Sequence, residues 1–274
     1  MSVNDALAQI DGWAVDNAAA AVVAADGTIL GSRGDLDRRF RLASVTKPLT
    51  AYAALLAVEE GVFDLDTPAG PAGSTVRHLL AHTSGLDFSS DQVRAQPGTR
   101  RIYSNSGFDV LAATVTELSG IPFVDYLDEA VLQPLGMTST RLEGAAGAGA
   151  VSTVADLTRF AAELQHPTLL DPTTLAAATA VVFAGVDGVL PGYGVQKPND
   201  WGLGFEIRDG KSPHWTSTAN SPATFGHFGQ SGTFLWVDPQ AGIACIVLAD
   251  RDFGQWAIDA WPPLSDAVLA AVRA

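Results

Sequence analysis

The sequence predicts an α/β (α+β) fold in which an antiparallel sheet, built from both ends of the chain and flanked by helices, carries an inserted and mostly helical lobe. Short apolar runs separated by a turn lie near the N-terminus, and strand-like alternation returns after Trp201. The long stretch between them is dominated by helical spacing. We therefore assign residues 1–43 and 200–274 to a discontinuous sheet lobe and residues 44–199 to a helical lobe, with the active site at the seam.

The N-terminal region is predicted to be a helix followed by a hairpin. Apolar residues recur at helical spacing over residues 2–16, which indicates an amphipathic helix. Residues 20–24 form an apolar run typical of a strand, and Asp26-Gly27 is typical of a tight turn. Residues 28–30 are therefore expected to be the partner strand.

Helical patterns dominate the middle of the chain. The longest predicted helix covers residues 45–60 and ends at Gly61. The other helices expected here are residues 76–81, a helix capped by Ser106 and ended by Gly120, residues 122–132, and residues 154–164 with Thr153 as N-cap. Residues 144–149 are predicted to be a small-residue linker, and residues 185–199 a region of Gly- and Pro-rich loops.

Strand patterns return in the last part of the chain. Strands are expected at residues 203–207, 225–228, 232–237 and 243–249. A closing helix over residues 255–273 is expected to be interrupted at Pro262-Pro263, because proline lacks the amide hydrogen that a helix interior needs.

Composition and charge indicate a globular protein that does not bind nucleic acid. The chain has 274 residues, 47% of them hydrophobic, which suffices for a substantial core. Its 30 acidic residues outnumber its 16 basic ones and give a net charge of −14, which argues against a phosphate-backbone partner. The basic runs at residues 38–41 and 100–101 are interpreted as solvated loops. Cys245 is the single cysteine, so no intramolecular disulfide is possible, and it lies in an apolar run typical of a buried strand.

No targeting or membrane segment is predicted. Residues 1–13 lack the basic region and the continuous apolar run of a secretory signal. No uncharged apolar run approaches the length of about 18 residues that a membrane-spanning helix needs. We therefore expect a cytoplasmic protein without a membrane partner.

The first candidate catalytic group is Ser44 with Lys47, at the start of the helix predicted over residues 45–60. Residues three apart at a helix start lie one turn apart on one face, so the lysine nitrogen can reach the serine oxygen. Free backbone amides and the positive end of the helix dipole favour a developing anion there. The spacing suits activation of a serine nucleophile, although about 0.2 such matches arise by chance in this chain.

The second candidate group is Tyr103 with Asn105, just before the helix that Ser106 is expected to cap. A phenol near a lysine can hold or pass a proton, and an amide can both donate to a substrate carbonyl and orient the lysine. About 0.07 Tyr-x-Asn matches are expected by chance. A surface tyrosine in a loop before a helix is the alternative interpretation.

The third candidate group is His227, Phe228 and Gly229, followed by Gln230, on a predicted strand. Glycines there let a backbone edge approach a ligand closely, and the Gln230 main-chain N–H could pair with that of Ser44 as an oxyanion hole. A core histidine at a bend of the sheet is the alternative. About 0.5 His-x-Gly matches arise by chance, but the three groups together have a chance rate below about 0.01, so the combination carries the prediction.

With these three groups the sequence resembles the serine β-lactamase and penicillin-binding-protein superfamily. Within it, the resemblance is to the branch of class C β-lactamases, D-Ala-D-Ala carboxypeptidases and family VIII carboxylesterases. It extends to residues 79–86, 134–137, 201–205 and 226–233, and so covers most of the chain from about residue 20. The resemblance implies a β-lactamase-like fold and an acylated serine.

The resemblance also implies a role for each candidate residue. Ser44 would be the nucleophile, with Lys47 and Tyr103 sharing the transfer of its proton. Asn105 would orient the substrate and the lysine, and residues 227–229 would occupy the place of a Lys-Thr-Gly-like motif. Free lysine and tyrosine both titrate at about pH 10, so only one of them can be the resting base, and the sequence leaves open which one.

Two departures from the family pattern bear on the substrate. His227 stands where β-lactamases carry a lysine, which removes a permanent cation, and Phe228 stands where a small hydroxyl residue is usual. Both changes favour a less anionic substrate. We therefore expect a carboxylesterase-type hydrolase of small esters or amides. The alternatives are a β-lactamase or D-amino-acid peptidase, and, from another class, a non-catalytic ligand-binding or assembly protein of the same fold.

No cofactor or metal is expected. His78 and His82 are four apart, but they lie at a turn, and no acidic third ligand stands at a recognisable spacing. The expected partner is a small-molecule ester, amide or β-lactam substrate, while the natural substrate and the oligomeric state are left open by the sequence.

Overall fold

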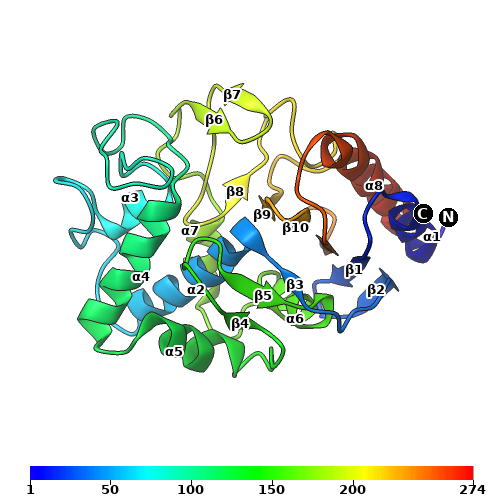
Figure 1. Cartoon of the computed structure of the whole chain (residues 1–274), viewed down its shortest axis with the longest axis horizontal. Coiled ribbons are helices and arrows are strands. Elements are labelled where there is room, and N and C mark those ends of the chain that lie inside the picture. The colour runs from blue at the N-terminus through cyan, green and yellow to red at the C-terminus, as the bar shows by residue number, and fades with distance from the viewer. Residues whose placement is uncertain (274) are drawn as a thin grey trace.

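A six-stranded antiparallel sheet forms the centre of the protein (Figure 1). The computed structural model describes residues 1–273. The strand order is β2-β1-β11-β10-β9-β8. These strands are β1 (Ala18–Ala24), β2 (Ile29–Arg33), β8 (Glu206–Ile207), β9 (Phe225–Gly229), β10 (Thr233–Asp238) and β11 (Ile243–Ala249). Two strands come from the N-terminal end and four from the C-terminal end, so the predicted sheet built from both ends of the chain is confirmed.

Helices cover both faces of this sheet. They are α1 (Val3–Leu7), α2 (Thr46–Glu59), α3 (Val76–Leu80), α4 (Asn105–Ser119), α5 (Phe123–Leu127), α6 (Val154–Glu163), α7 (Pro172–Ala178) and α8 (Gln255–Arg273). The two terminal helices, α1 and α8, pack together on one face, while α2 and α6 pack on the other (Figure 1). In β1, Ala20 and Val22 face α1 and α8, and Ala21 and Val23 face the opposite cluster. Burial on both faces explains why this strand is a continuous apolar run.

Two smaller sheets lie outside the central one. A three-stranded sheet has the order β3-β5-β4, with β3 (Phe40–Arg41), β4 (Arg141–Leu142) and β5 (Ala150–Ser152). A hairpin of β6 (Gly188–Leu190) and β7 (Gly194–Gln196) lies within residues 185–199, which the sequence predicts as loops. The strands of both sheets are too short for apolar and polar residues to alternate visibly along the sequence. The glycines of the β6–β7 hairpin contribute no side chain to such a pattern.

Two helix predictions are wrong, one in where the helix ends and the other in where it is interrupted. The first helix, predicted over residues 2–16, ends at Leu7 and continues only as a tight 3-10 turn to Gly12. The last helix is not interrupted at Pro262-Pro263 and runs without a break from Gln255 to Arg273. Its buried face packs against the sheet, and this packing outweighs the backbone hydrogen bonds that the prolines cannot donate.

Three further expectations need correction. Ser104, not Ser106, caps α4, because its side chain accepts the Gly107 amide at 3.0 Å. The strand predicted at residues 203–207 is reduced to β8, since glycine at 204 adopts a positive φ of 89° and turns the chain. Helix α7 was not predicted at all, because its few residues are too short to show a helical period.

Two other expectations concern burial and membranes. Cys245 is buried in β11, as predicted. Among residues 1–273, no single helix is long and apolar enough to cross a membrane. Helix α4 and the following helical segment Phe123–Leu132, which meet at a bend of 89°, together have the length and apolar composition of a membrane-spanning segment.

A buried arginine joins the segment before α4 to its surroundings. Arg101 is only 2% exposed, so the interpretation of residues 100–101 as a solvated loop is wrong for this residue, although it holds for Arg100. Its guanidinium donates to the carbonyl oxygens of Ala81 at 2.5 Å and Asn199 at 2.7 Å, and to those of Val182 and Phe183 at 2.9 and 3.2 Å. Burial lowers its pKa to about 10. One side chain therefore satisfies four carbonyls from three separate loops.

Replacing this arginine is expected to destabilise the protein far more than replacing its neighbour. Arg101→Met leaves four carbonyls without their donor and should lower the free energy of unfolding by about 3 kcal/mol or more. Arg100→Met is the matched control, because Arg100 is exposed and its loss should change stability by no more than about 0.5 kcal/mol. Urea denaturation measures both, and equal stabilities would contradict the role assigned to Arg101.

Candidate active site

The site is built around the amine of Lys47, which lies in the first turn of α2 and has no exposed surface. Its Nζ lies 2.6 Å from Asn105 Oδ1, 2.8 Å from the carbonyl oxygen of Gly147 and 3.3 Å from Ser44 Oγ. Burial lowers the pKa of Lys47 well below its usual range, and the distant charge of Asp109 opposes this only in part. A neutral amine next to a hydroxyl can accept its proton.

Ser44 lies in a 3-10 turn, Ala43–Val45, immediately before α2, and is partly exposed. The preceding residue, Ala43, has a φ of 45°, in the left-handed region that a residue with a Cβ rarely adopts. The loop before it is fastened to the hairpin of β9 and β10. Thr233 Oγ1 donates to the carbonyl oxygen of Leu42 at 2.8 Å, and Ser231 Oγ donates to that of Arg41 at 2.6 Å.

Gly229 lets the end of β9 approach this loop closely. A Cβ at this position would lie 2.3 Å from the carbonyl oxygen of Leu42 and 3.2 Å from Ala43 Cβ. Only glycine therefore allows the strand to lie directly against the residue that precedes Ser44. The sequence singled out Gly229 as part of a binding motif, and the structure adds that it sets the spacing between the sheet and the loop that carries Ser44.

Tyr103 closes the site on the side of α4. The Lys47 amine lies 4.5 Å from the centre of its ring. Its hydroxyl oxygen is buried and makes no hydrogen bond of good geometry within residues 1–273. Burial raises the pKa of Tyr103 well above its usual range, with a smaller opposing effect from the nearby Ser44 hydroxyl. Burial thus favours the protonated phenol of Tyr103 and the neutral amine of Lys47.

His227 closes the site on the side of the sheet. Its ring centre lies 5.7 Å from that of Tyr103 and 5.4 Å from that of Trp201. Its Nδ1 lies 2.7 Å from the carbonyl oxygen of Phe228, which assigns the proton to Nδ1. Burial is the largest cause that lowers the pKa of His227, to about 3, so the ring is neutral. Its Nε2 is buried without a hydrogen-bond partner in the described part of the chain.

A cavity of about 90 Å³ lies between these groups. It is lined by Ser44, Phe88, Tyr103, Leu190, Pro191, Trp201, Glu206, His227, Phe228 and Gln230. Aromatic and aliphatic side chains make up most of its wall. Since His227 and Tyr103 are neutral, Glu206 is the one lining side chain that carries a charge.

Glu206 is held as an anion by buried partners. Lys211 contacts its Oε1, His214 Nε2 lies 2.9 Å from its Oε2, and the Trp215 indole N–H donates to Oε2 at 2.8 Å. Burial alone would raise the pKa of this carboxyl, but His214 and Lys211 outweigh it and hold the pKa at about 2. All its acceptor positions face protein donors, so Glu206 shapes the wall of the cavity.

The structure brings the predicted site residues together. Lys47 contacts both Ser44 and Asn105, the rings of Tyr103 and His227 are neighbours with centres 5.7 Å apart, and Gln230 follows β9 and lines the cavity. Phe228 lines the cavity but also packs into the opposite core, with ring centres 5.0 Å from Phe253 and 5.9 Å from Trp261.

The sequence analysis missed three contributors. Gly147 supplies a carbonyl to Lys47 from a segment interpreted only as a linker. Glu206 and Trp201 line the cavity, and the tryptophan lies within a segment that carried the resemblance but was given no role. His82, which was considered as a metal ligand, packs between Tyr103 and Trp201 with ring centres 4.7 Å from each. No group of three or more potential metal ligands occurs among residues 1–273.

A serine hydroxyl beside a buried amine and a buried phenol, at the rim of an apolar cavity, is the arrangement of a hydrolase that transfers an acyl group to serine. The comparison with protein families agrees with this class. The chain belongs to the β-lactamase family, whose model matches residues 11–268.

Similar proteins within this family differ in activity. A crystal structure of a β-lactamase from Mycobacterium bovis is 63% identical, with a TM-score of 0.96, over 97% of this chain and 99% of that one. Esterase EstB from Burkholderia gladioli is 34% identical over a match that covers 43% of this chain and 45% of the relative. The carboxypeptidase/endopeptidase AmpH of Escherichia coli is 28% identical over 39% of this chain and 38% of the relative. The chain thus spans less than half the length of these two curated relatives.

The close approach at Gly229 leads to a stability prediction. Gly229→Ala would force the Leu42–Ala43 backbone to move, and should lower the free energy of unfolding by about 1–3 kcal/mol. Gly12→Ala is the control, because a Cβ there meets nothing within 4 Å. Thermal unfolding of both variants tests the prediction, and a Gly229→Ala protein as stable as the control would contradict it.

Proposed function

We propose that this protein is a carboxylesterase-type serine hydrolase that cleaves small, neutral esters through an acyl-Ser44 intermediate. The observation that carries the proposal is the electrostatic character of the cavity beside Ser44. Its lining has no cation to hold a carboxylate next to the scissile bond, since His227 is neutral and the one charged side chain, Glu206, is an anion. A neutral acyl group enters such a cavity without an unpaired buried charge.

Acylation follows from the contacts of Lys47. Its neutral amine accepts the proton of the Ser44 hydroxyl as Oγ forms a bond to the substrate carbonyl carbon. The ammonium that forms is stabilised by Asn105 Oδ1 and the Gly147 carbonyl, which are already in place. When the tetrahedral intermediate collapses, the bond to the leaving oxygen breaks, and the proton passes to that oxygen with Tyr103 as the intermediary.

The negative charge that develops on the carbonyl oxygen also needs donors. The Ser44 N–H, in the first turn of a helix, and the N–H of Gln230, just after β9, are the pair proposed for this oxyanion hole. Gly229 supports this assignment because it lets the two backbone segments approach each other. Deacylation uses the same groups in reverse, with water in place of the leaving alcohol.

A β-lactamase is the second candidate, because the Mycobacterium bovis neighbour with 63% identity is a β-lactamase. A D-amino-acid peptidase is supported by the more distant similarity to AmpH. Non-catalytic ligand binding is the alternative of another class, and the intact contact between Ser44 and Lys47 argues against it.

Covalent labelling tests the proposed nucleophile. A fluorophosphonate probe should add one equivalent of mass to the wild-type protein, because Lys47 activates Ser44, and none to Ser44→Ala. Ser106→Ala, which changes a nearby serine with no contact to Lys47, should be labelled like the wild type. Intact-protein mass spectrometry measures all three, and an adduct that survives Ser44→Ala would exclude this nucleophile.

The substrate class is tested with the same proteins. Short-chain p-nitrophenyl esters should be hydrolysed with a higher kcat/KM than nitrocefin or D-alanyl-D-alanine peptides. Faster turnover of nitrocefin would favour the β-lactamase. Inertness of a folded protein toward all three substrates would favour the non-catalytic alternative.

The pH dependence of ester hydrolysis tests the assignment of Lys47 as the base. Only the neutral amine accepts a proton, so kcat/KM should fall as pH falls through the Lys47 pKa. Because burial lowers that pKa, the midpoint should lie well below the value of about 10.4 for a free lysine. Lys47→Arg, a permanent cation, should lower kcat/KM by about a thousandfold or more at every pH.

His227→Asn is the control for this profile. The pKa of His227 is about 3, so its titration lies below the activity range. The variant should therefore keep the pH at which kcat/KM is half-maximal, whatever its effect on the maximal rate. Loss of this pH dependence in His227→Asn would assign the base to the histidine and contradict the proposal.

A further inference from the structure

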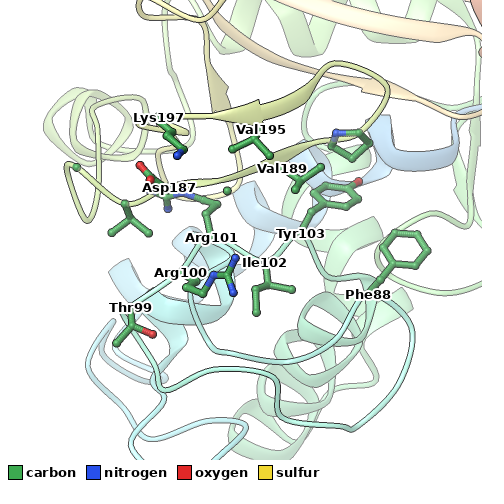
Figure 2. A pocket seen from close by; sticks show the side chains of 14 residues that line it. Phe88, Thr99, Arg100, Arg101, Ile102, Tyr103, Asp187, Val189, Val195 and Lys197 are labelled. Atoms are coloured by element: carbon green, nitrogen blue, oxygen red, sulfur yellow. The ribbon is translucent and has the colours of Figure 1, made fainter.

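A second, larger hollow opens beside the catalytic cavity and has no role in the mechanism above. This outer groove, about 810 Å³ in volume, is formed by residues 99–103, residues 185–197 and Phe88 (Figure 2). It shares Phe88, Tyr103 and Pro191 with the cavity that Ser44 lines. A ligand bound at Ser44 can therefore extend past Tyr103 into the groove.

The end of the groove nearest Tyr103 is apolar. Phe88 is 50% exposed, Val189 54% and Val195 62%. The two valines are cross-strand partners in the β6–β7 hairpin, and Figure 2 shows them above the groove, with Tyr103 and Phe88 to one side. Three large apolar side chains left in water around one hollow provide a surface that a ligand would cover.

The opposite end of the groove is cationic. Figure 2 places Arg100 and Lys197 away from Phe88 and Tyr103, with Asp187 beside the lysine. Arg100 and Lys197 are exposed, and neither takes part in an ion pair among the residues that the structure describes. In a chain with 30 acidic and 16 basic residues, two free cations at one groove end are available for an anion.

The groove is preformed. Arg101 fixes its floor through the four carbonyl contacts described above, so its own charge is not available to a ligand. The Arg101 amide donates to the carbonyl oxygen of Asp187 at 2.9 Å, which joins the two sides. A Cβ at Gly188 would lie 2.5 Å from the Arg101 carbonyl oxygen, so glycine is needed for this approach.

We propose that the outer groove binds the leaving group of the substrate, and that it fits a leaving group with an apolar, aromatic or branched segment next to the scissile oxygen and a carboxylate beyond it. This inference rests on the proposed function, in which Tyr103 passes the proton to the leaving oxygen. A proton donor must lie within hydrogen-bond reach of the atom it protonates, so the leaving group lies on the Tyr103 side. That is the side on which the groove opens.

The test compares leaving groups that differ only in remote charge. Two butyrate esters share a phenol, one derived from 3-(4-hydroxyphenyl)propionate and the other from its carboxamide. Wild-type kcat/KM should be about three- to tenfold higher for the carboxylate, as expected for two exposed charges, and the ratio should decrease as salt is raised. A butyrate ester of glycolate carries its carboxylate next to the scissile bond. Its kcat/KM should be no higher than that of the corresponding glycolamide ester.

Charge-reversal variants locate the effect. Arg100→Glu combined with Lys197→Glu should bring the carboxylate-to-carboxamide ratio to one or below. Arg141→Glu and Arg273→Glu together make the same charge change at exposed positions outside the groove and should keep the wild-type ratio. A wild-type ratio of one, or an equal loss in both double variants, would overturn the groove assignment while leaving the esterase proposal intact. Absence of ester hydrolysis altogether would instead count against the proposed function.

Discussion

The buried amine of Lys47 is the constraint on which the rest of the site depends. An amine with no exposed surface is tolerated only when acceptors surround it, and here they come from three separate segments. Helix α2 must therefore pack against the start of α4 and against the loop that carries Gly147. Two threonines of α2 hold that loop, since Thr50 Oγ1 donates to the Ala146 carbonyl at 2.7 Å and Thr46 Oγ1 accepts the Ala150 amide at 3.0 Å.

The helical side and the sheet side of the site contribute different groups. The helical side supplies the amine, the phenol and the oxygen atoms of Asn105 and Gly147 that accept hydrogen bonds from the amine. The sheet side lines the cavity with His227 and Phe228, and its residues Ser231 and Thr233 donate hydrogen bonds to the two residues before Ala43. Glu206 also belongs to this side, where its carboxylate pairs with Lys211 and accepts hydrogen bonds from His214 and Trp215. Ser44, the proposed nucleophile, thus lies between the side proposed for proton transfer and the side proposed for the oxyanion hole.

The sequence predicts much of this arrangement because the informative signals are local. The spacing of Ser44 and Lys47 is a property of one helix turn, and the strands β9, β10 and β11 follow from apolar runs bounded by turns. What it does not predict depends on contacts between distant segments. The carbonyl of Gly147 reaches Lys47 across 100 residues of sequence. The unbroken course of α8 through two prolines likewise depends on its burial against the sheet, which no local pattern records.

Two different physical effects would select the two parts of a substrate. Inside the small cavity, selection acts through desolvation, because a charged acyl group would lose water and find Glu206 instead of a cation. In the outer groove the side chains stay in water, so charge acts weakly and is screened by salt, while contact with Phe88, Val189 and Val195 contributes through burial. Under the proposed function, strict selection of the acyl group and graded selection of the leaving group would follow from this difference in solvent exposure. Such a hydrolase would distinguish neutral from charged acyl groups sharply, and would accept a range of leaving groups whose affinity rises with apolar contact and remote negative charge.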